Sequence, residues 1–236
     1  MCTVSFIKSQ GKVIITSNRD EQTSRPSAIA PKNYIVGGKN VVYPKDQKAG
    51  GTWYAVDERG TVLVLLNGAS EKHIIRSPYR KSRGLVVLEL IASLSPKEFW
   101  NDIDLHNIEP FTMVLLLHDQ LFQLQWDGSN KITQELDANE HHIWSSSTLY
   151  PKDVRAYRVN LFKSFLQQKK WIAEEDMYQF HRYTDDENQE NGFVINRNNE
   201  LKTLSITQSV IQMDKVSIIH YDLLTQEKST ISFSIV

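Results

Sequence analysis

Cys2 is the only cysteine in the 236-residue chain, and it directly follows the initiator methionine. Removal of Met1 would give Cys2 a free α-amine with a pKa near ~7.7–8.0, so one residue could supply both a thiol nucleophile and a general base. If Met1 stays attached, that nitrogen is an amide and the chemistry fails. The alternative is a small side chain buried at the edge of the core, since free cysteines are often buried. Position and residue type favour neither interpretation.

The polar run Asn18-Arg19-Asp20-Glu21 follows an apolar segment and could lie beside Cys2. Residues 2–8 alternate between apolar and polar types and residues 13–16 are β-branched, so we predict two strands joined as a hairpin. A two-residue Gln10-Gly11 turn would place Cys2 opposite Arg19, and longer loops would place it opposite Asn18 or Asp20. A guanidinium there would favour the thiolate, and a carboxylate would hold the ammonium. The alternative is a solvated strand end with a surface ion pair worth ~0–1 kcal/mol.

The remaining sequence predicts one domain, residues 1–236, with strands at both ends and helices between them. The run 61–66 is apolar almost throughout, which is typical of a central strand covered on both faces. Residues 22–50 contain prolines and glycines and residues 183–200 are polar, so both are predicted to be mainly loop. Helices are predicted at 83–94, 96–104, 152–170 (with Val154, Tyr157, Leu161 and Phe165 as its apolar stripe) and 173–182. Further strands are predicted at 34–36, 41–43, 52–56, 111–118 and 121–126, and residues 203–236 are predicted to form a meander of three strands.

The composition is that of an ordinary globular protein, 40% hydrophobic and 23% charged with a net charge of −1. This balance gives no electrostatic argument for a nucleic-acid partner. No apolar stretch reaches ~18 residues and no secretory segment is visible, so we expect no membrane span and a cytoplasmic location. The sequence contains no metal-binding motif, so we expect no metal and no cofactor. The expected partner is a small-molecule substrate or a hydrophobic ligand, and the oligomeric state is left open.

Several short motifs occur in an order that is similar to a known family. They are SNRDE at 17–21, Ser24-Arg25-Pro26, Gly50-Gly51-Thr52-Trp53, Asn67, and Ser82-Arg83-Gly84. In this order they resemble the NRDE family, also called the transport and Golgi organisation protein 2 family. The resemblance is dense over residues 1–95 and thin beyond them.

The resemblance implies an α+β fold of the N-terminal nucleophile (Ntn) hydrolase type, an αββα four-layer sandwich of two antiparallel sheets between helices. The family is similar to bile salt hydrolases and penicillin V acylases, which cleave amide bonds with a processed N-terminal cysteine. Carried over by position, Cys2 would be the nucleophile, Asp20 the carboxylate near the amine, and Asn67 the oxyanion-hole amide. An amide donor at such a site typically contributes ~10²–10³ in rate. From the residue alone, Asn67 is equally well a turn residue beside Gly68.

Two positions depart from the acylase pattern. Ser146 stands where those enzymes carry a second asparagine, and Gln208 stands where they carry a late arginine. We therefore expect Cys2, Asp20 and Asn67 to be catalytic, and Asn18, Arg19, Ser146 and Gln208 to bind the ligand. The expected function is hydrolysis of a non-peptide amide or ester. The alternative is a non-catalytic protein that binds or moves a hydrophobic ligand, a lipid or haem, on the same fold.

Overall fold

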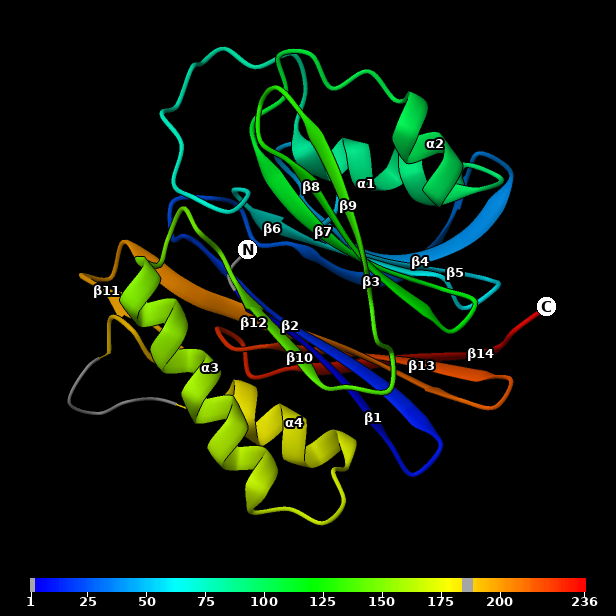
Figure 1. Cartoon of the computed structure of the whole chain (residues 1–236), viewed down its shortest axis with the longest axis vertical. Coiled ribbons are helices and arrows are strands. Elements are labelled where there is room, and N and C mark those ends of the chain that lie inside the picture. Colours follow the sequence, from blue (N-terminus) through cyan, green and yellow to red (C-terminus); the bar gives the residue numbers. More distant parts are fainter. Residues whose placement is uncertain (1–2, 184–188) are drawn as a thin grey trace. The chain divides into compact units, whose positions relative to one another are not determined.

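The computed structural model describes residues 3–183 and 189–236, which form two compact units (Figure 1). Unit 1 contains the described residues up to Arg25 together with Asn139–Ser234, and unit 2 contains Pro26–Ala138 with the last two residues. Each unit is built on one antiparallel sheet and carries two helices. The two antiparallel sheets and the helices confirm the predicted α+β class.

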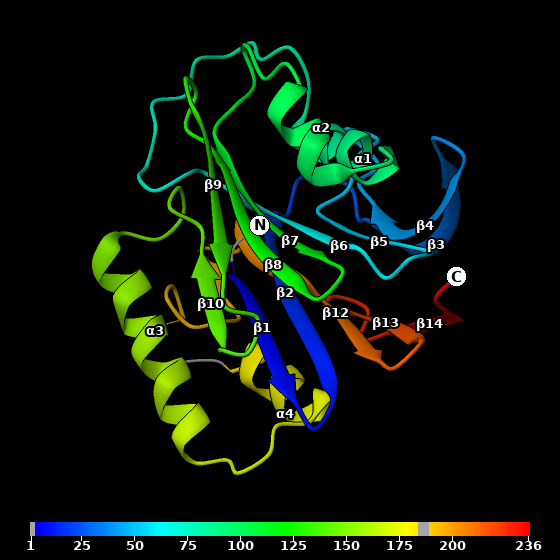
Figure 2. The same ribbon diagram turned by 45° about the vertical axis from the view of Figure 1, so that its right-hand side comes forward.

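The sheet of unit 1 has the order β10-β1-β2-β12-β13-β14, with β11 paired to β12. Helix α3 packs against β10, and α4 packs against β2 and β12 (Figure 2). The elements are β1 (Thr3–Ser9), β2 (Lys12–Gln22), β10 (His142–Ser145), α3 (Lys152–Gln167), α4 (Glu174–His181), β11 (Asn196–Arg197), β12 (Leu201–Gln212), β13 (Lys215–Asp222) and β14 (Lys228–Ser234). The three-stranded meander predicted for the end of the chain is confirmed.

A two-residue turn joins β1 and β2, which confirms the predicted hairpin. Gln10 and Gly11 both have positive φ, 50° and 72°, as a type I′ turn requires. Ser9 therefore pairs with Lys12, and the register runs without a bulge to the pair Thr3 and Asn18. The predicted pairing of Cys2 with Arg19 is the next step of this register and lies outside the described residues.

The helices of unit 1 cover one face of its sheet with aromatic and aliphatic side chains. Ile7 and Ile14 on the first hairpin meet Phe162 of α3 and Phe180 of α4 in one buried cluster. The predicted stripe of α3 was wrong at Tyr157, which is 43% exposed. Its neighbour Arg158 is buried instead, because the fold supplies hydrogen-bond acceptors for the guanidinium.

The polar segment 183–200 was predicted to be an exposed loop, and this is wrong for its second half. Phe193 and Ile195 are each 1% exposed, and Asn196–Arg197 pairs with β12. Phe193 belongs to one core cluster of unit 1 and Ile195 belongs to another. The burial of their apolar surface outweighs the polar composition of the residues around them. Residues 184–188 of the predicted loop lie outside the described residues.

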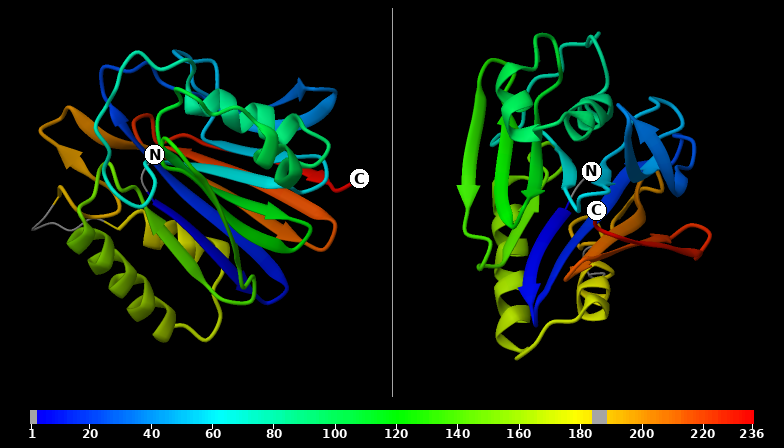
Figure 3. Two further views of the ribbon diagram at one scale, coloured as in Figure 1. Left: turned by 45° about the horizontal axis from the view of Figure 1, so that its top comes forward. Right: turned by 90° about the vertical axis from the view of Figure 1, so that its right-hand side faces the viewer.

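The sheet of unit 2 has the order β3-β4-β5-β6-β7-β8-β9. Strand β6 is the central strand and is buried from Val62 to Leu66, as the apolar run predicted. Helix α1 packs on β4, β5 and β6 and contacts α2 (Figure 3). The elements are β3 (Ile29–Val36), β4 (Lys39–Lys45), β5 (Tyr54–Asp57), β6 (Val62–Asn67), α1 (Arg83–Ala92), α2 (Pro96–Asp102), β7 (Phe111–Leu117), β8 (Gln120–Trp126) and β9 (Lys131–Leu136).

Residues 22–50 contain more strand than their prolines predicted. β3 is an edge strand, and its pairing with β4 shifts register between Ile29 and Lys32, where Pro31 sits. Pro44 lies in β4 beyond Val41 and Val42, the residues that pair with β5. Edge and unpaired positions tolerate proline because no ladder hydrogen bond is lost there.

The turn between β7 and β8 lies one residue earlier than the predicted strands 111–118 and 121–126 placed it. It is formed by His118 and Asp119, with φ of 47° and 66°.

Two glycines bring the loop before β5 against the start of α1. A Cβ atom on Gly84 would lie 2.8 Å from the carbonyl oxygen of Thr52, and one on Gly51 would lie 2.4 Å from the carbonyl carbon of Gly84. The backbone N–H of Thr52 donates a hydrogen bond to the carbonyl of Gly84 at 3.1 Å. Two of the sequence motifs, Gly50-Gly51-Thr52-Trp53 and Ser82-Arg83-Gly84, are therefore in direct backbone contact.

Replacing Gly84 with alanine is expected to lower the free energy of unfolding by about 1–3 kcal/mol, the usual cost of overpacking. Helix propensity alone predicts the opposite sign, a gain of about 1 kcal/mol, because alanine is the better helix former. Urea denaturation of the Gly84→Ala protein and its parent therefore distinguishes the two expectations by the sign of the change in the free energy of unfolding. A Gly84→Ala protein more stable than its parent would contradict the backbone contact.

Among the residues that the structure describes, none of the helices is long and apolar enough to cross a membrane.

Candidate functional site

Asp20 is held in a buried position near the end of β2. Its side chain accepts hydrogen bonds from the Tyr150 hydroxyl at 2.6 Å and from the Thr203 hydroxyl at 2.5 Å, one on each carboxylate oxygen. Asp20 is only 3% exposed, and Arg19 beside it is 2% exposed. The alternative of a solvated strand end is therefore wrong for both residues. Two donors fix the direction of this carboxylate, as a site that orders a reactive group requires.

Tyr150 is itself held by a buried arginine of α3. The Arg158 guanidinium lies 3.5 Å from the centroid of the Tyr150 ring and is fully buried. It donates hydrogen bonds to the Thr3 hydroxyl at 2.7 Å and to the backbone carbonyls of Asn191 and Gly192. Arg158 thus connects the first residue of β1 with the tyrosine that binds Asp20. A desolvated guanidinium over an aromatic face is a favourable contact of about 2 kcal/mol.

Asn18 lies on the helix-facing side of the sheet and is fully buried. Its amide donates to the backbone carbonyls of His181 and Phe193, both at 2.9 Å. Its side-chain oxygen accepts from Nδ1 of His181, so Nε2 of the neutral ring accepts from the Ser5 hydroxyl at 2.7 Å. Burial lowers the pKa of His181 to about 3 and keeps the ring neutral. Both amide donors of Asn18 are therefore used inside unit 1.

Arg19 lies on the opposite face of the sheet from Asn18, because successive strand residues point to opposite faces. The prediction of one polar cluster, Asn18-Arg19-Asp20, is therefore corrected: the fold separates Arg19 from its two neighbours. Arg19 pairs with Ser205 of β12, and Ser17 pairs with Thr207 on the same face. Its guanidinium lies 3.7 Å from the Glu21 carboxylate.

The face of the sheet around Arg19 is polar, buried and incompletely hydrogen-bonded. The hydroxyls of Ser17 and Ser205 are buried and have no hydrogen-bond partner among the described residues. Thr207 is hydrogen-bonded to Nδ1 of His220 at 2.8 Å. Burial, with a smaller contribution from the Arg19 charge, lowers the pKa of His220 to about 4 and outweighs the opposing effect of Asp222. Buried hydroxyls without partners are rare in native proteins and are typical of a place where a ligand or water binds.

Ser146 and Gln208, the two departures from the acylase pattern, lie in different surroundings. Ser146 follows β10 directly, is 1% exposed and is hydrogen-bonded to the Thr148 hydroxyl at 2.9 Å. Gln208 donates to the Thr16 hydroxyl and to the carbonyl of Glu174, both at 3.0 Å. Gln208 therefore shares the face of Asn18 and not that of Arg19.

Asn67 is the last residue of β6 in unit 2, where it pairs with Phe111. The backbone after it is fixed at Gly68, which has φ of 82°. The Gly68 N–H donates to the carbonyl of Pro110 at 3.0 Å, and its carbonyl accepts from the Thr112 hydroxyl at 2.9 Å. The position of Cys2 lies outside the described residues.

The sequence interpretation missed the residues that hold Asp20 and surround Arg19. Tyr150 and Arg158 belong to none of the motifs, and only the fold brings them to β2. The sequence did contain a signal for the residues around Arg19, because hydroxyl side chains alternate along one predicted strand. A buried strand with hydroxyls on one face indicates a polar surface. On the face of Arg19 these residues are Ser205, Thr207 and Ser209, whereas the register shift after Thr203 leaves that hydroxyl on the face of Asp20.

A profile of the family described as transport and Golgi organisation 2 (TANGO2) matches residues 1–227. The chain belongs to this family. A search of curated proteins gave no significant match. Among solved structures, the Caenorhabditis elegans ortholog of N-acylethanolamine-hydrolyzing acid amidase is similar with a TM-score of 0.60 and 12% identity, covering 88% of this chain and 92% of that one.

A variant of the conjugated bile acid hydrolase from Clostridium perfringens is also similar, with a TM-score of 0.51 and 10% identity, covering 100% of this chain and 98% of that one. At these identities the likeness shows the fold alone. The family member therefore has the Ntn-hydrolase fold that the motifs implied. The described residues contain no group of three or more His, Cys, Asp or Glu side chains placed to hold a metal ion.

Proposed function

We propose that this family member is an Ntn-type cysteine hydrolase that cleaves a non-peptide amide or ester. The observation that carries the proposal is the buried Asp20 carboxylate, fixed by Tyr150 and Thr203 at the end of the strand that pairs with β1. Each carboxylate oxygen can accept more than one hydrogen bond, so Asp20 can receive a further donor besides Tyr150 and Thr203. The α-ammonium of a processed Cys2 would be such a group.

Successive residues of β2 point to opposite faces of the sheet, so we assign different roles to Arg19 and Asp20. Arg19 would lie on the thiol side and favour the thiolate, while Asp20 would orient the α-amine that acts as general base. Thr3 pairs with Asn18 on one side and with Ser145 on the other. Arg19 is the next residue of β2 and Ser146 directly follows β10, so both would adjoin Cys2. Asn67 would donate to the oxyanion.

The buried polar face around Arg19 favours a substrate with polar atoms at the reacting centre. The unpartnered hydroxyls of Ser17 and Ser205 can both donate to and accept from an amide or ester group. The two similar structures are named as hydrolases of N-acylethanolamine and of conjugated bile acid, which supports a small N-acyl amide as the substrate class. A purely hydrophobic ligand, the alternative raised by the sequence, would leave these hydroxyls unsatisfied.

The proposal is tested by the state and reactivity of the chain's single thiol. Intact-mass measurement should show that Met1 is absent. Iodoacetamide at pH 7 should modify the folded protein about tenfold faster than the same protein in urea, because an ordinary thiol with a pKa near ~8.5 is only a few per cent thiolate there. The urea-unfolded chain is the matched control, since it contains the same cysteine without the site. Retention of Met1 in the native host, or a folded thiol slower than the unfolded one, would rule out the mechanism.

A further inference from the structure

We propose that a cavity in unit 2 binds the carboxylate of an N-acyl amino acid, which makes this the class of amide that the protein accepts. The cavity has a volume of about 400 Å³. Its walls include His73, Ile74, Arg76, Tyr79, Ile108 and Pro110, together with the turn at 127–129. Hydrolysis of the bound ligand rests on the proposed function, but binding of the ligand does not.

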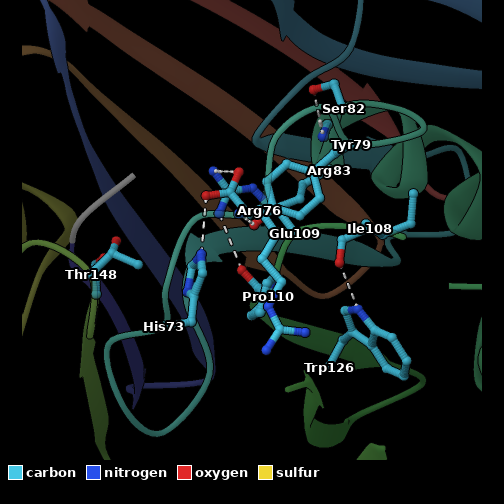
Figure 4. Close-up of polar contacts among 12 residues, drawn as sticks. His73, Arg76, Tyr79, Ser82, Arg83, Ile108, Glu109, Pro110, Trp126 and Thr148 are labelled. Atoms are coloured by element: carbon cyan, nitrogen blue, oxygen red, sulfur yellow. Dashed lines mark hydrogen bonds and ion pairs between the residues drawn. The ribbon is translucent and has the colours of Figure 1, made fainter. Parts of the chain in front are cut away.

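His73 is held in a fixed orientation with one ring nitrogen left for a ligand. Its Nε2 donates to the Glu109 carboxylate at 3.2 Å, and Glu109 in turn pairs with Arg83 at 3.0 Å (Figure 4). Arg83 is anchored by a hydrogen bond to the carbonyl of Pro110 at 3.1 Å. The other ring nitrogen, Nδ1, is buried and has no hydrogen-bond partner among the described residues. In the neutral ring this atom accepts a hydrogen bond, so the site calls for an N–H or O–H donor.

Arg76 is the arginine of the cavity wall, and it has no acidic partner among the residues that the structure describes. Three other basic residues nearby have acidic partners: Arg80 pairs with Asp104, Lys81 with Glu89 and Arg83 with Glu109. Within the described part of the chain, no side chain forms an ion pair or hydrogen bond with the Arg76 guanidinium. Arg76 is exposed on this wall, and a guanidinium recognises planar carboxylates because its N–H groups match both oxygens.

Asp127, the one acidic residue in the cavity wall, already accepts hydrogen bonds within its own turn. One oxygen of Asp127 accepts from the backbone N–H groups of Ser129 and Asn130, both at 2.7 Å, and the other accepts from the Asn130 side chain. These hydrogen bonds lower the pKa of Asp127, so it stays charged without pairing with Arg76. Its negative charge disfavours ligands with a second anionic group.

The ligand class follows from these groups together. Arg76 fits a carboxylate, His73 fits an adjacent N–H donor, and Ile74, Ile108 and Pro110 supply apolar contact for a chain. An N-acyl amino acid carries an amide N–H next to its carboxylate and an apolar acyl group. The cavity also adjoins the proposed oxyanion residue within unit 2, because Pro110 in its wall accepts the N–H of Gly68, which follows Asn67.

The test measures binding to a Cys2→Ala chain, so that no turnover can occur. By calorimetry, N-lauroylglycine should bind more tightly than N-lauroylethanolamine, which lacks the carboxylate. Arg76→Gln should weaken binding of N-lauroylglycine about tenfold and leave the ethanolamide unchanged, the usual effect of losing a charge-assisted hydrogen bond. Lys72→Gln is the matched control: it removes a charge from the same loop but not from the cavity wall, and both affinities should hold.

A second variant separates the two recognition groups. His73→Phe keeps an aromatic ring but removes the acceptor, so it should weaken both probes several-fold, and thermal melting checks that the variant folds. Equal affinities of the two probes, no effect of Arg76→Gln, or no binding would overturn the site. If binding and its dependence on Arg76 hold but the unsubstituted protein hydrolyses neither probe, the proposed hydrolase fails and the carboxylate site stands. Hydrolysis that does not depend on Arg76 would support the hydrolase and overturn the carboxylate site.

Discussion

Replacing Cys2 with alanine is expected to lower kcat/KM for N-lauroylglycine by about 10⁴-fold or more, the loss seen when a catalytic nucleophile is removed. The chain has no second cysteine that could take over the reaction. The expected binding affinity is unchanged, because the proposed contacts of the carboxylate lie in unit 2. Release of lauric acid, measured by mass spectrometry, reports the chemical step directly.

A variant with an added N-terminal residue gives the matched control for this substitution. A non-cleavable glycine placed before Cys2 keeps the thiol but converts its α-amine to an amide, which removes the proposed general base. This protein should be nearly as inactive as Cys2→Ala, while a tag at the other end of the chain should have no effect. Full activity of the extended protein would contradict the Ntn mechanism even if Cys2 proved essential.

The first hairpin shows how much the sequence could predict about the fold. Alternation in residues 2–8 and the Gln10-Gly11 turn were enough to give the strands and the register, because a type I′ turn fixes which residues are paired. The central position of β6 also followed from its unbroken apolar run. Predictions failed where composition opposed burial, as at Phe193 in a polar segment, or where a bulge admitted Pro31 into a strand.

The surroundings of Asp20 could not be predicted in the same way. Tyr150 and Thr203 are far from Asp20 in the sequence, and no spacing rule joins residues of three separate segments of the chain. The division of Asn18 and Arg19 between two faces was predictable from strand periodicity. The family motif obscured it, because a contiguous motif suggests one contiguous cluster. Burial of Arg158 in an amphipathic helix had no signal, since its partners are mostly backbone carbonyls.

Acidification from pH 7 to pH 5 is expected to lower the free energy of unfolding by about 4 kcal/mol through His181 and His220. Burial lowers the pKa of His181 to about 3 and that of His220 to about 4. In the unfolded chain both would titrate near ~6.5. Below that pH the unfolded state binds more protons than the folded state, so stability falls as pH falls and is fully present above pH ~6.5. Each histidine contributes about 1.4 kcal/mol per pH unit in this window.

Urea denaturation at several pH values between 7 and 5 measures this slope. His181→Gln and His220→Gln should each remove about half of the histidine contribution, whatever they do to stability at pH 7, because glutamine does not titrate. His106→Gln is the matched control, since His106 is exposed and lies outside both buried sites. Carboxylates that titrate near pH 5 affect all four proteins alike and cancel in the comparison. The same slope in His181→Gln as in its parent would mean that the ring is protonated in the folded state, and the hydrogen bonds that join Ser5, His181 and Asn18 would then have to be reassigned.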